Sequence, residues 1–105
     1  MKIVLSIAGS DSGGGAGIQA DIKSGEFHGV FMTTAITAVT AQNTKGVQDI
    51  CVLEPDFVKT QILSVLNDFE VNTIKIGMLG SKNLVLKVKK VIKKLDIPII
   101  LDPVA

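Results

Sequence analysis

The sequence lacks the features of secreted and membrane proteins. It contains a single cysteine, Cys51, so no internal disulfide can form, and a reducing cytoplasm is the expected location. The first apolar stretch extends only to Ala8, which is too short for a signal peptide, and no apolar run approaches the roughly 18 residues that cross a bilayer. We therefore expect a soluble cytoplasmic protein with no membrane contact.

Aromatic residues and net charge are also scarce. Aromatics make up 4% of the chain, with no Trp or Tyr, so the core must be aliphatic. The formal net charge is +1, which argues against a nucleic-acid partner because phosphate binding needs clustered excess cations. A chain of 105 residues that is 47% hydrophobic and 20% charged is typical of one globular domain.

Apolar, β-branched stretches alternate with segments of helical periodicity along the chain. Strands are predicted at 3–8, 30–41, 47–53, 72–80 and 98–101, and helices at 18–28, 54–69 and 81–95. This order, β-α-β-β-α-β-α-β, predicts an α/β fold with a mostly parallel sheet flanked by helices. The stretch 47–53 is expected at a sheet edge or in a small flap, with Cys51 as a small core residue.

The stretch from Ala8 to Asp21 has the most unusual composition, with five of the ten glycines. Glycine costs backbone entropy, so such a cluster indicates tight turns or close backbone approach. A polar, glycine-rich turn after a parallel strand is where α/β proteins bind ligands. The turns at Gln42-Asn43, Gly77–Gly80 and Asp102 also follow predicted strands, so we expect all four segments on one rim.

Neither common nucleotide-binding motif fits this loop. The stretch 15–20 formally matches a dinucleotide fingerprint, but Gln42 and Asn43 stand where the ribose-binding acid is expected. No Gly-Lys-Ser/Thr follows the glycines, so the loop is not a P-loop.

Each remaining candidate residue has two interpretations. Asp21 is a solvated helix acid or a pocket acid, Gln42 satisfies turn backbone or reads a heteroaromatic ring, and Met78 fills the core or walls a pocket.

Four ordered blocks resemble one family. The stretch 7–21, IAGSDSGGGAGIQAD, resembles the opening signature of hydroxymethylpyrimidine/phosphomethylpyrimidine kinases. The stretches 37–47 (TAVTAQNTKGV), 75–80 (KIGMLG) and 101–104 (LDPV) resemble its later signatures. The resemblance implies a ribokinase-like fold and the phosphorylation of 4-amino-5-hydroxymethyl-2-methylpyrimidine, and of its monophosphate, in thiamine biosynthesis. ATP and Mg²⁺ are the implied cofactors, and a homodimer is an implied assembly.

The resemblance also implies roles for individual residues. Asp102 matches an acid near the metal and the phosphates. No catalytic residue is expected in this chain, because the family's ATP-binding segments and catalytic base lie in its C-terminal part. The chain alone is therefore expected to be inactive. The positions that match the pyrimidine pocket are Gly9, Asp21, Gln42, Met78 and Val104.

The last predicted strand, 98–101, has no helix after it to cover its apolar face. We therefore expect residues 1–105 to be the N-terminal portion of a single larger kinase domain, with a small complete flavodoxin-like domain as the alternative. Two other functions stay open. One is a pyridoxal kinase of the same superfamily, and the other is a non-catalytic module that binds the pyrimidine or an oligomer partner.

Overall fold

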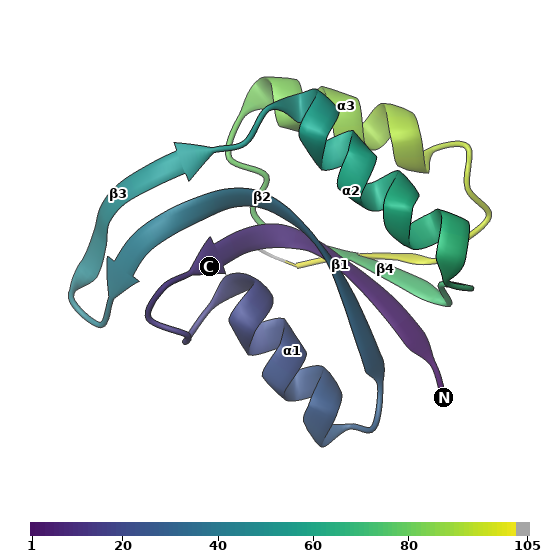
Figure 1. The fold of residues 1–105 in the computed structure, drawn as a ribbon, viewed down its shortest axis with the longest axis horizontal. Helices are drawn as coiled ribbons and strands as arrows, with labels where there is room; N and C mark the ends of the chain where they lie inside the picture. The colour runs from purple at the N-terminus through teal and green to yellow at the C-terminus, as the bar shows by residue number, and fades with distance from the viewer. Residues whose placement is uncertain (103–105) are drawn as a thin grey trace.

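The computed structural model describes residues 1–102 and contains one sheet of five strands with three helices (Figure 1). The strand order is β3-β2-β1-β4-β5, in which β1, β2, β4 and β5 are parallel and β3 is antiparallel to β2. The predicted order of elements and the mostly parallel sheet are both confirmed. The elements are β1 (Ile3–Asp11), α1 (Gly17–Phe27), β2 (Phe31–Asn43), β3 (Gly46–Val52), α2 (Pro55–Asp68), β4 (Thr73–Ile76), α3 (Lys82–Ile92) and β5 (Ile99–Leu101).

Helices cover the sheet from both sides, with α1 on one face and α2 and α3 on the other (Figure 1). Alternation along β1 sends Leu5 and Ile7 into the α2/α3 layer and Ser6 toward α1. The main core therefore lies between the sheet and α2/α3, and it is aliphatic, as the composition requires. Its most buried members are Leu5, Ile7, Ala35, Val58, Ile62, Ile74, Leu84 and Val88.

Local signals set the helix ends much as the sequence predicts. Ser81 caps α3, its hydroxyl oxygen accepting from the Leu84 N–H at 3.1 Å. Gly29 follows α1 with a φ of +70°, the left-handed conformation that ends many helices. On α3, Leu84 and Val88 are buried and Val85 is exposed.

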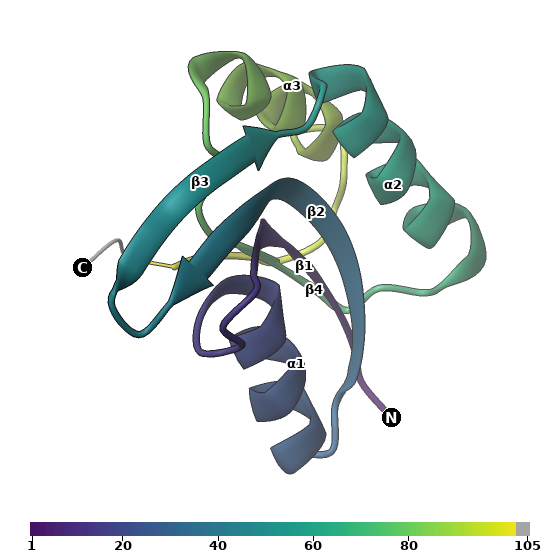
Figure 2. The same cartoon turned by 60° about the vertical axis from the view of Figure 1, so that its left-hand side comes forward.

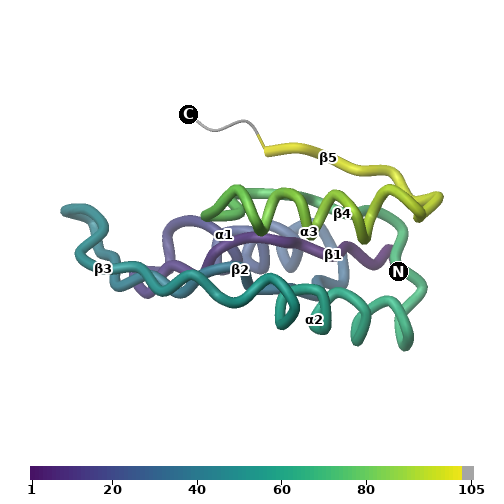
Figure 3. Tube along the Cα trace, turned by 90° about the horizontal axis from the view of Figure 1, so that it is seen from above, coloured from purple at the N-terminus to yellow at the C-terminus, as the bar shows by residue number. Residues whose placement is uncertain are grey.

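The β2–β3 hairpin extends from the body of the molecule and curls away from it (Figures 2 and 3). The edge position predicted for this segment is confirmed, since β3 pairs only with β2 among residues 1–102. All seven residues of β3 are exposed, including Cys51. The expectation that Cys51 is a core residue is therefore wrong. An edge strand with so little covering it leaves even its apolar residues in solvent.

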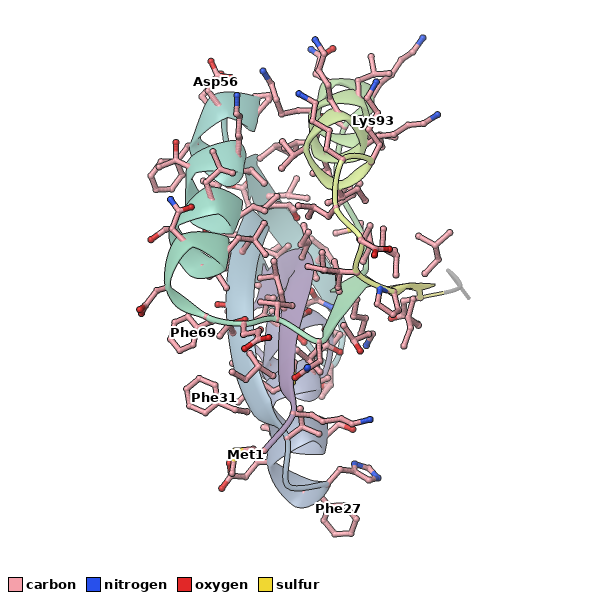
Figure 4. All side chains as sticks on the ribbon, turned by 90° about the vertical axis from the view of Figure 1, so that its right-hand side faces the viewer. Met1, Phe27, Phe31, Asp56, Phe69 and Lys93 are labelled. Carbon is pink, nitrogen blue, oxygen red and sulfur yellow. The ribbon has the colours of Figure 1, made fainter. Side chains whose placement is uncertain are left out.

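An aromatic contact lies at the amino-terminal end of the sheet. Phe31, at the start of β2, stacks on Phe69, just after α2, with ring centroids 5.7 Å apart (Figure 4). Lys93, directly after α3, is exposed (Figure 4). Within residues 1–102, no helix has both the length and the apolar character needed to span a bilayer.

The connections place a crevice at the carboxyl ends of the strands. From β1 the chain passes through α1 to β2 on one side, whereas α2 leads to β4 on the other side of β1. The strand order thus reverses direction at β1. Loops that leave a sheet in opposite directions open a crevice between them, and α/β proteins bind ligands there.

Candidate functional site

A cavity of about 400 Å³ occupies this crevice. Its walls come from the glycine loop after β1, the β2–β3 hairpin, the turn after β4 and Asp102 after β5. The predicted gathering of the strand-end turns on one rim is confirmed. A larger groove of about 710 Å³ lies between the start of α2 and the lysines of α3, but none of the predicted site residues lines it. We therefore place the candidate site in the smaller cavity.

The glycine loop is organised around the Asp11 carboxylate. Its Oδ1 accepts from the Gly13 N–H at 2.7 Å, and its Oδ2 accepts from the Gly15 N–H at 2.9 Å. The Asp11 carbonyl accepts from the Gly14 N–H at 3.0 Å. These amide groups would be the phosphate-binding donors of a nucleotide loop. Because a carboxylate of the chain already holds them, the loop is not arranged to take a phosphate.

Gly17 brings the start of α1 against the end of β1. A Cβ at this position would lie 2.2 Å from the Gly9 carbonyl oxygen, and the φ of Gly17 is +58°. Only glycine permits this approach without a shift of the backbone. Gly9 is itself buried and lines the cavity, where its own Cβ would meet the Met78 Cε at 3.6 Å. The two glycines bring the backbone to the cavity wall.

Asp21 is held inside the structure and is not a solvated helix acid. Its side chain is 10% exposed, its Oδ2 accepts from the Ser6 hydroxyl at 2.6 Å, and its Oδ1 pairs with the Lys75 ammonium. The Lys75 Nζ also lies 3.6 Å from an oxygen of Asp102. Burial lowers the pKa of Lys75, but the hydrogen bond and charge of Asp21, with Asp102, outweigh it and hold that pKa above its usual value. Lys75 thus contacts two acids of the cavity wall without lining the cavity itself, and the sequence did not single it out.

Gln42 is fixed at its backbone and presents its side chain to the cavity. The Ser12 hydroxyl accepts from the Gln42 N–H and lies within donating distance of the Gln42 carbonyl, both at 2.7 Å. The Gln42 Oε1 lies 3.0 Å from the Thr40 hydroxyl. Gln42 was expected either to satisfy the turn backbone or to read a heteroaromatic ring, and in the structure the Ser12 hydroxyl satisfies that backbone. The carboxamide lines the cavity instead.

Apolar side chains form the remaining walls. Met78 is half exposed and lines the cavity, so it is a pocket wall and not core, and the Thr37 hydroxyl donates to its carbonyl at 3.0 Å. Val47 and Ile50 of β3 line the cavity as well, although no local sequence pattern marks them as site residues. Cross-strand pairing provides the missing signal. Gln42 is opposite Val47 and Thr40 is opposite Ile50, and paired residues share a face of the sheet.

The metal expectation rests on Asp102 in the described part of the chain. Asp102 lines the cavity with a half-exposed side chain, but residues 1–102 contain no group of three or more His, Cys, Asp or Glu side chains placed to hold an ion. One carboxylate beside an ammonium is not a Mg²⁺ site by itself. Val104, the fifth predicted pocket residue, lies outside the described residues.

The fold and the edge cavity define an α/β protein of the ribokinase-like vitamin kinase class. A crystal structure of phosphomethylpyrimidine kinase from Clostridium difficile matches with a TM-score of 0.93 at 43% identity, covering 99% of this chain and 46% of that one. Bacillus subtilis pyridoxal kinase, solved as an ADP complex, matches with a TM-score of 0.90 at 33% identity, covering 100% of this chain and 42% of that one.

Within that class, the sequence profile described as phosphomethylpyrimidine kinase matches residues 11–105, and the chain belongs to this family. The hydroxymethylpyrimidine/phosphomethylpyrimidine kinase of Haemophilus influenzae is 56% identical over 85 residues, which cover 81% of this chain and 32% of that protein. The predicted family resemblance is confirmed. The chain spans between 16% and 40% of the length of the curated relatives it matches.

Proposed function

We propose that this chain forms the pyrimidine-binding part of a kinase that phosphorylates 4-amino-5-hydroxymethyl-2-methylpyrimidine and its monophosphate with MgATP, in thiamine biosynthesis. One observation carries the proposal. The cavity at the carboxyl edge unites Gly9, Asp21, Gln42 and Met78, four of the five residues expected at the substrate, and adds Asp102 at its rim. The names of the relatives support the same activity.

The chemistry of the cavity suits a small amino-substituted heteroaromatic ring. Met78, Val47 and Ile50 offer apolar surface to the faces of a ring. The carboxamide of Gln42 can donate and accept at one edge, which matches a ring nitrogen beside an amino group. Asp21 keeps unused lone pairs beyond its bonds to Ser6 and Lys75, so it can accept a hydrogen bond from a substrate donor.

We propose further that these residues bind the pyrimidine without transferring a phosphoryl group. Phosphoryl transfer depends on positioning and on charges that stabilise the transferred group, with the bound Mg²⁺ of MgATP supplying much of that charge. In the described residues the glycine loop is held by Asp11, and Asp102 is the acid that could contribute to a metal site. Incubation of the chain with MgATP and the pyrimidine should give no phosphorylated product. Turnover on the order of 1 per second, typical of kinases, would contradict this.

Calorimetric titration with the pyrimidine alcohol tests the binding site directly. Asp21→Ala and Gln42→Ala should each weaken binding by about tenfold or more, the usual effect of one lost hydrogen bond in a desolvated site. Gln48→Ala is the matched control for Gln42, because Gln48 lies in the same hairpin but does not line the cavity. Equal affinity in the wild type and both site variants would remove the assignment.

Pyridoxal is the second candidate substrate, because Bacillus subtilis pyridoxal kinase has the same fold at 33% identity. Titration of the same sample with pyridoxal and with the pyrimidine ranks the two ligands. If neither ligand binds, the remaining candidate is a non-catalytic module that binds an oligomer partner.

We also propose, from the family resemblance, a cytoplasmic location and a homodimer, for which the exposed edge of β3 offers a surface. Sedimentation equilibrium would measure the assembly.

A further inference from the structure

A single hydroxyl lies between the glycine loop and Gln42. Thr40 is 5% exposed, and its Oγ1 lies 2.9 Å from the Ser10 carbonyl oxygen and 3.0 Å from the Gln42 Oε1. Both neighbours are acceptors, but a hydroxyl has only one proton to donate. Thr40 can therefore donate to only one of them at a time.

The carboxamide of Gln42 has this hydroxyl as its anchor. Ser12 holds the Gln42 backbone and does not reach the side-chain amide. Among the contacts within residues 1–102, the Thr40 hydroxyl is the one hydrogen-bonding partner of that amide. When Thr40 donates to Oε1, the Nε2 hydrogens are left for a ligand in the cavity. When Thr40 donates to Ser10 instead, it can accept from the Gln42 amide group, and Oε1 is free.

The geometry of β2 places the Thr40 hydroxyl beside the Gln42 carboxamide. Residues two apart on a strand share a face, so Thr40 and Gln42 both face the cavity. The β2–β3 register shift leaves its extra residue, Gln48, on β3, so the alternation along β2 continues from Thr40 to Gln42. Thr40 is also 5% exposed, so few other partners compete for its hydroxyl.

We propose that Thr40 is a positioning residue that orients the Gln42 carboxamide and so sets which hydrogen-bonding edge the cavity selects. The inference rests on the proposed function, because it makes Gln42 the reader of the aminopyrimidine edge. Thr40 acts through Gln42 and takes no part in phosphoryl transfer. Because the hydroxyl holds one atom of the amide, the other atom is presented to a ring nitrogen or to its neighbouring amino group.

The first test needs no ligand. Side-chain ¹⁵N relaxation of the Gln42 amide, assigned by its loss in Gln42→Ala, reports whether that group is ordered. Thr40→Val removes the hydroxyl with little change of shape and should lower the order parameter of the Gln42 amide clearly below its wild-type value. Thr40→Ser keeps the hydroxyl and should restore the wild-type value. Thr40→Ala is a second hydroxyl-free variant should the valine variant fold poorly. An ordered Gln42 amide in both hydroxyl-free variants would overturn the proposal.

The second test measures selectivity by calorimetry, with two ligands that differ only in the 4-amino group. The wild type should prefer the aminopyrimidine alcohol over its 4-unsubstituted analogue by about tenfold or more. Thr40→Val should lose most of that preference while binding the analogue as the wild type does, and Thr40→Ser should retain it. An equal loss for both ligands would show a purely structural role and contradict the proposal. If the wild type binds neither ligand, the proposed function fails, and the relaxation result still decides the role of Thr40.

Discussion

Lys75 on β4 and Asp21 on α1 form an ion pair that ties the helix to the sheet beneath the cavity. Ser6 on β1, between the two elements, donates to the same carboxylate. The pair is largely screened from water, with side-chain exposures of 29% for Lys75 and 10% for Asp21. Since Asp102 lies 3.6 Å from the same ammonium, one lysine links the predicted pocket acid to the acid at the rim.

Removing the cation should destabilise the fold. Lys75→Met keeps the aliphatic stem but leaves the Asp21 carboxylate with Ser6 alone, and we expect the free energy of unfolding to fall by about 1–2 kcal/mol. Urea denaturation followed by circular dichroism measures the change. Lys87→Met is the matched control. Lys87 pairs at 2.8 Å with Asp56, which is exposed, so its loss should lower the free energy of unfolding much less than the loss of Lys75 does.

A double-mutant cycle isolates the pair itself. Asp21→Asn in the Lys75→Met background should cost less than it does in the wild type, because the charge it removes no longer has a partner. Additive effects of the two substitutions would show that Lys75 and Asp21 are not coupled, and the stabilising role given to the pair would then be wrong.

The same pair predicts how stability depends on alkaline pH. The pKa of Lys75 is raised in the folded protein above its usual 10.5, so folding favours the protonated amine. Its contribution is fully present below pH 10.5 and is lost as pH rises through the folded-state pKa. The difference in unfolding free energy between wild type and Lys75→Met should therefore be constant at neutral pH and shrink above pH 10.5. A difference that grows with pH in that range would reverse the sign and contradict the assignment.

Much of this architecture was predictable because it depends on local pattern. Helical periodicity located α2 and α3, and Ser81 and Gly29 marked helix ends by their own chemistry. The strand-end rule predicts Gln42 and Asp102 at one edge of the sheet, where both line the cavity. These inferences succeed because each depends on the residue itself or on its neighbours in the chain.

What the sequence did not reveal depends on pairing over long distances in the chain. Asp21 and Lys75 are 54 positions apart, and no local pattern marks them as partners. Ile50 reaches the cavity only through its register opposite Thr40. Cys51, its neighbour, faces away in an edge strand, and composition alone made it resemble a core residue. In each case the outcome was set by the strand order and register and not by residue type.

Gly17 should be the least replaceable glycine of the loop. An alanine there would place its Cβ 2.2 Å from the Gly9 carbonyl oxygen in a left-handed conformation, so Gly17→Ala should lower the free energy of unfolding by about 3 kcal/mol or more. Gly29→Ala is the control, since its φ is +70° but no atom lies within 4 Å of the added Cβ, and about 1 kcal/mol is expected. Equal losses would show that conformational strain alone decides both positions and that the close approach is relieved.

Cys51 should react as a free surface thiol. Because it is exposed on β3, a disulfide reagent such as dithionitrobenzoate should label it in the native chain without denaturant, at a rate close to that of the unfolded chain. Cys51→Ser should change the free energy of unfolding by no more than about 0.5 kcal/mol, as for other surface substitutions. Ala35→Cys in that background is the buried control and should label only on unfolding, since Ala35 is in the core.

A Cys51 that is protected at high protein concentration and reactive on dilution would show the β3 edge covered by a second copy, as the proposed homodimer requires. Protection that persists on dilution would contradict the exposed placement of this strand.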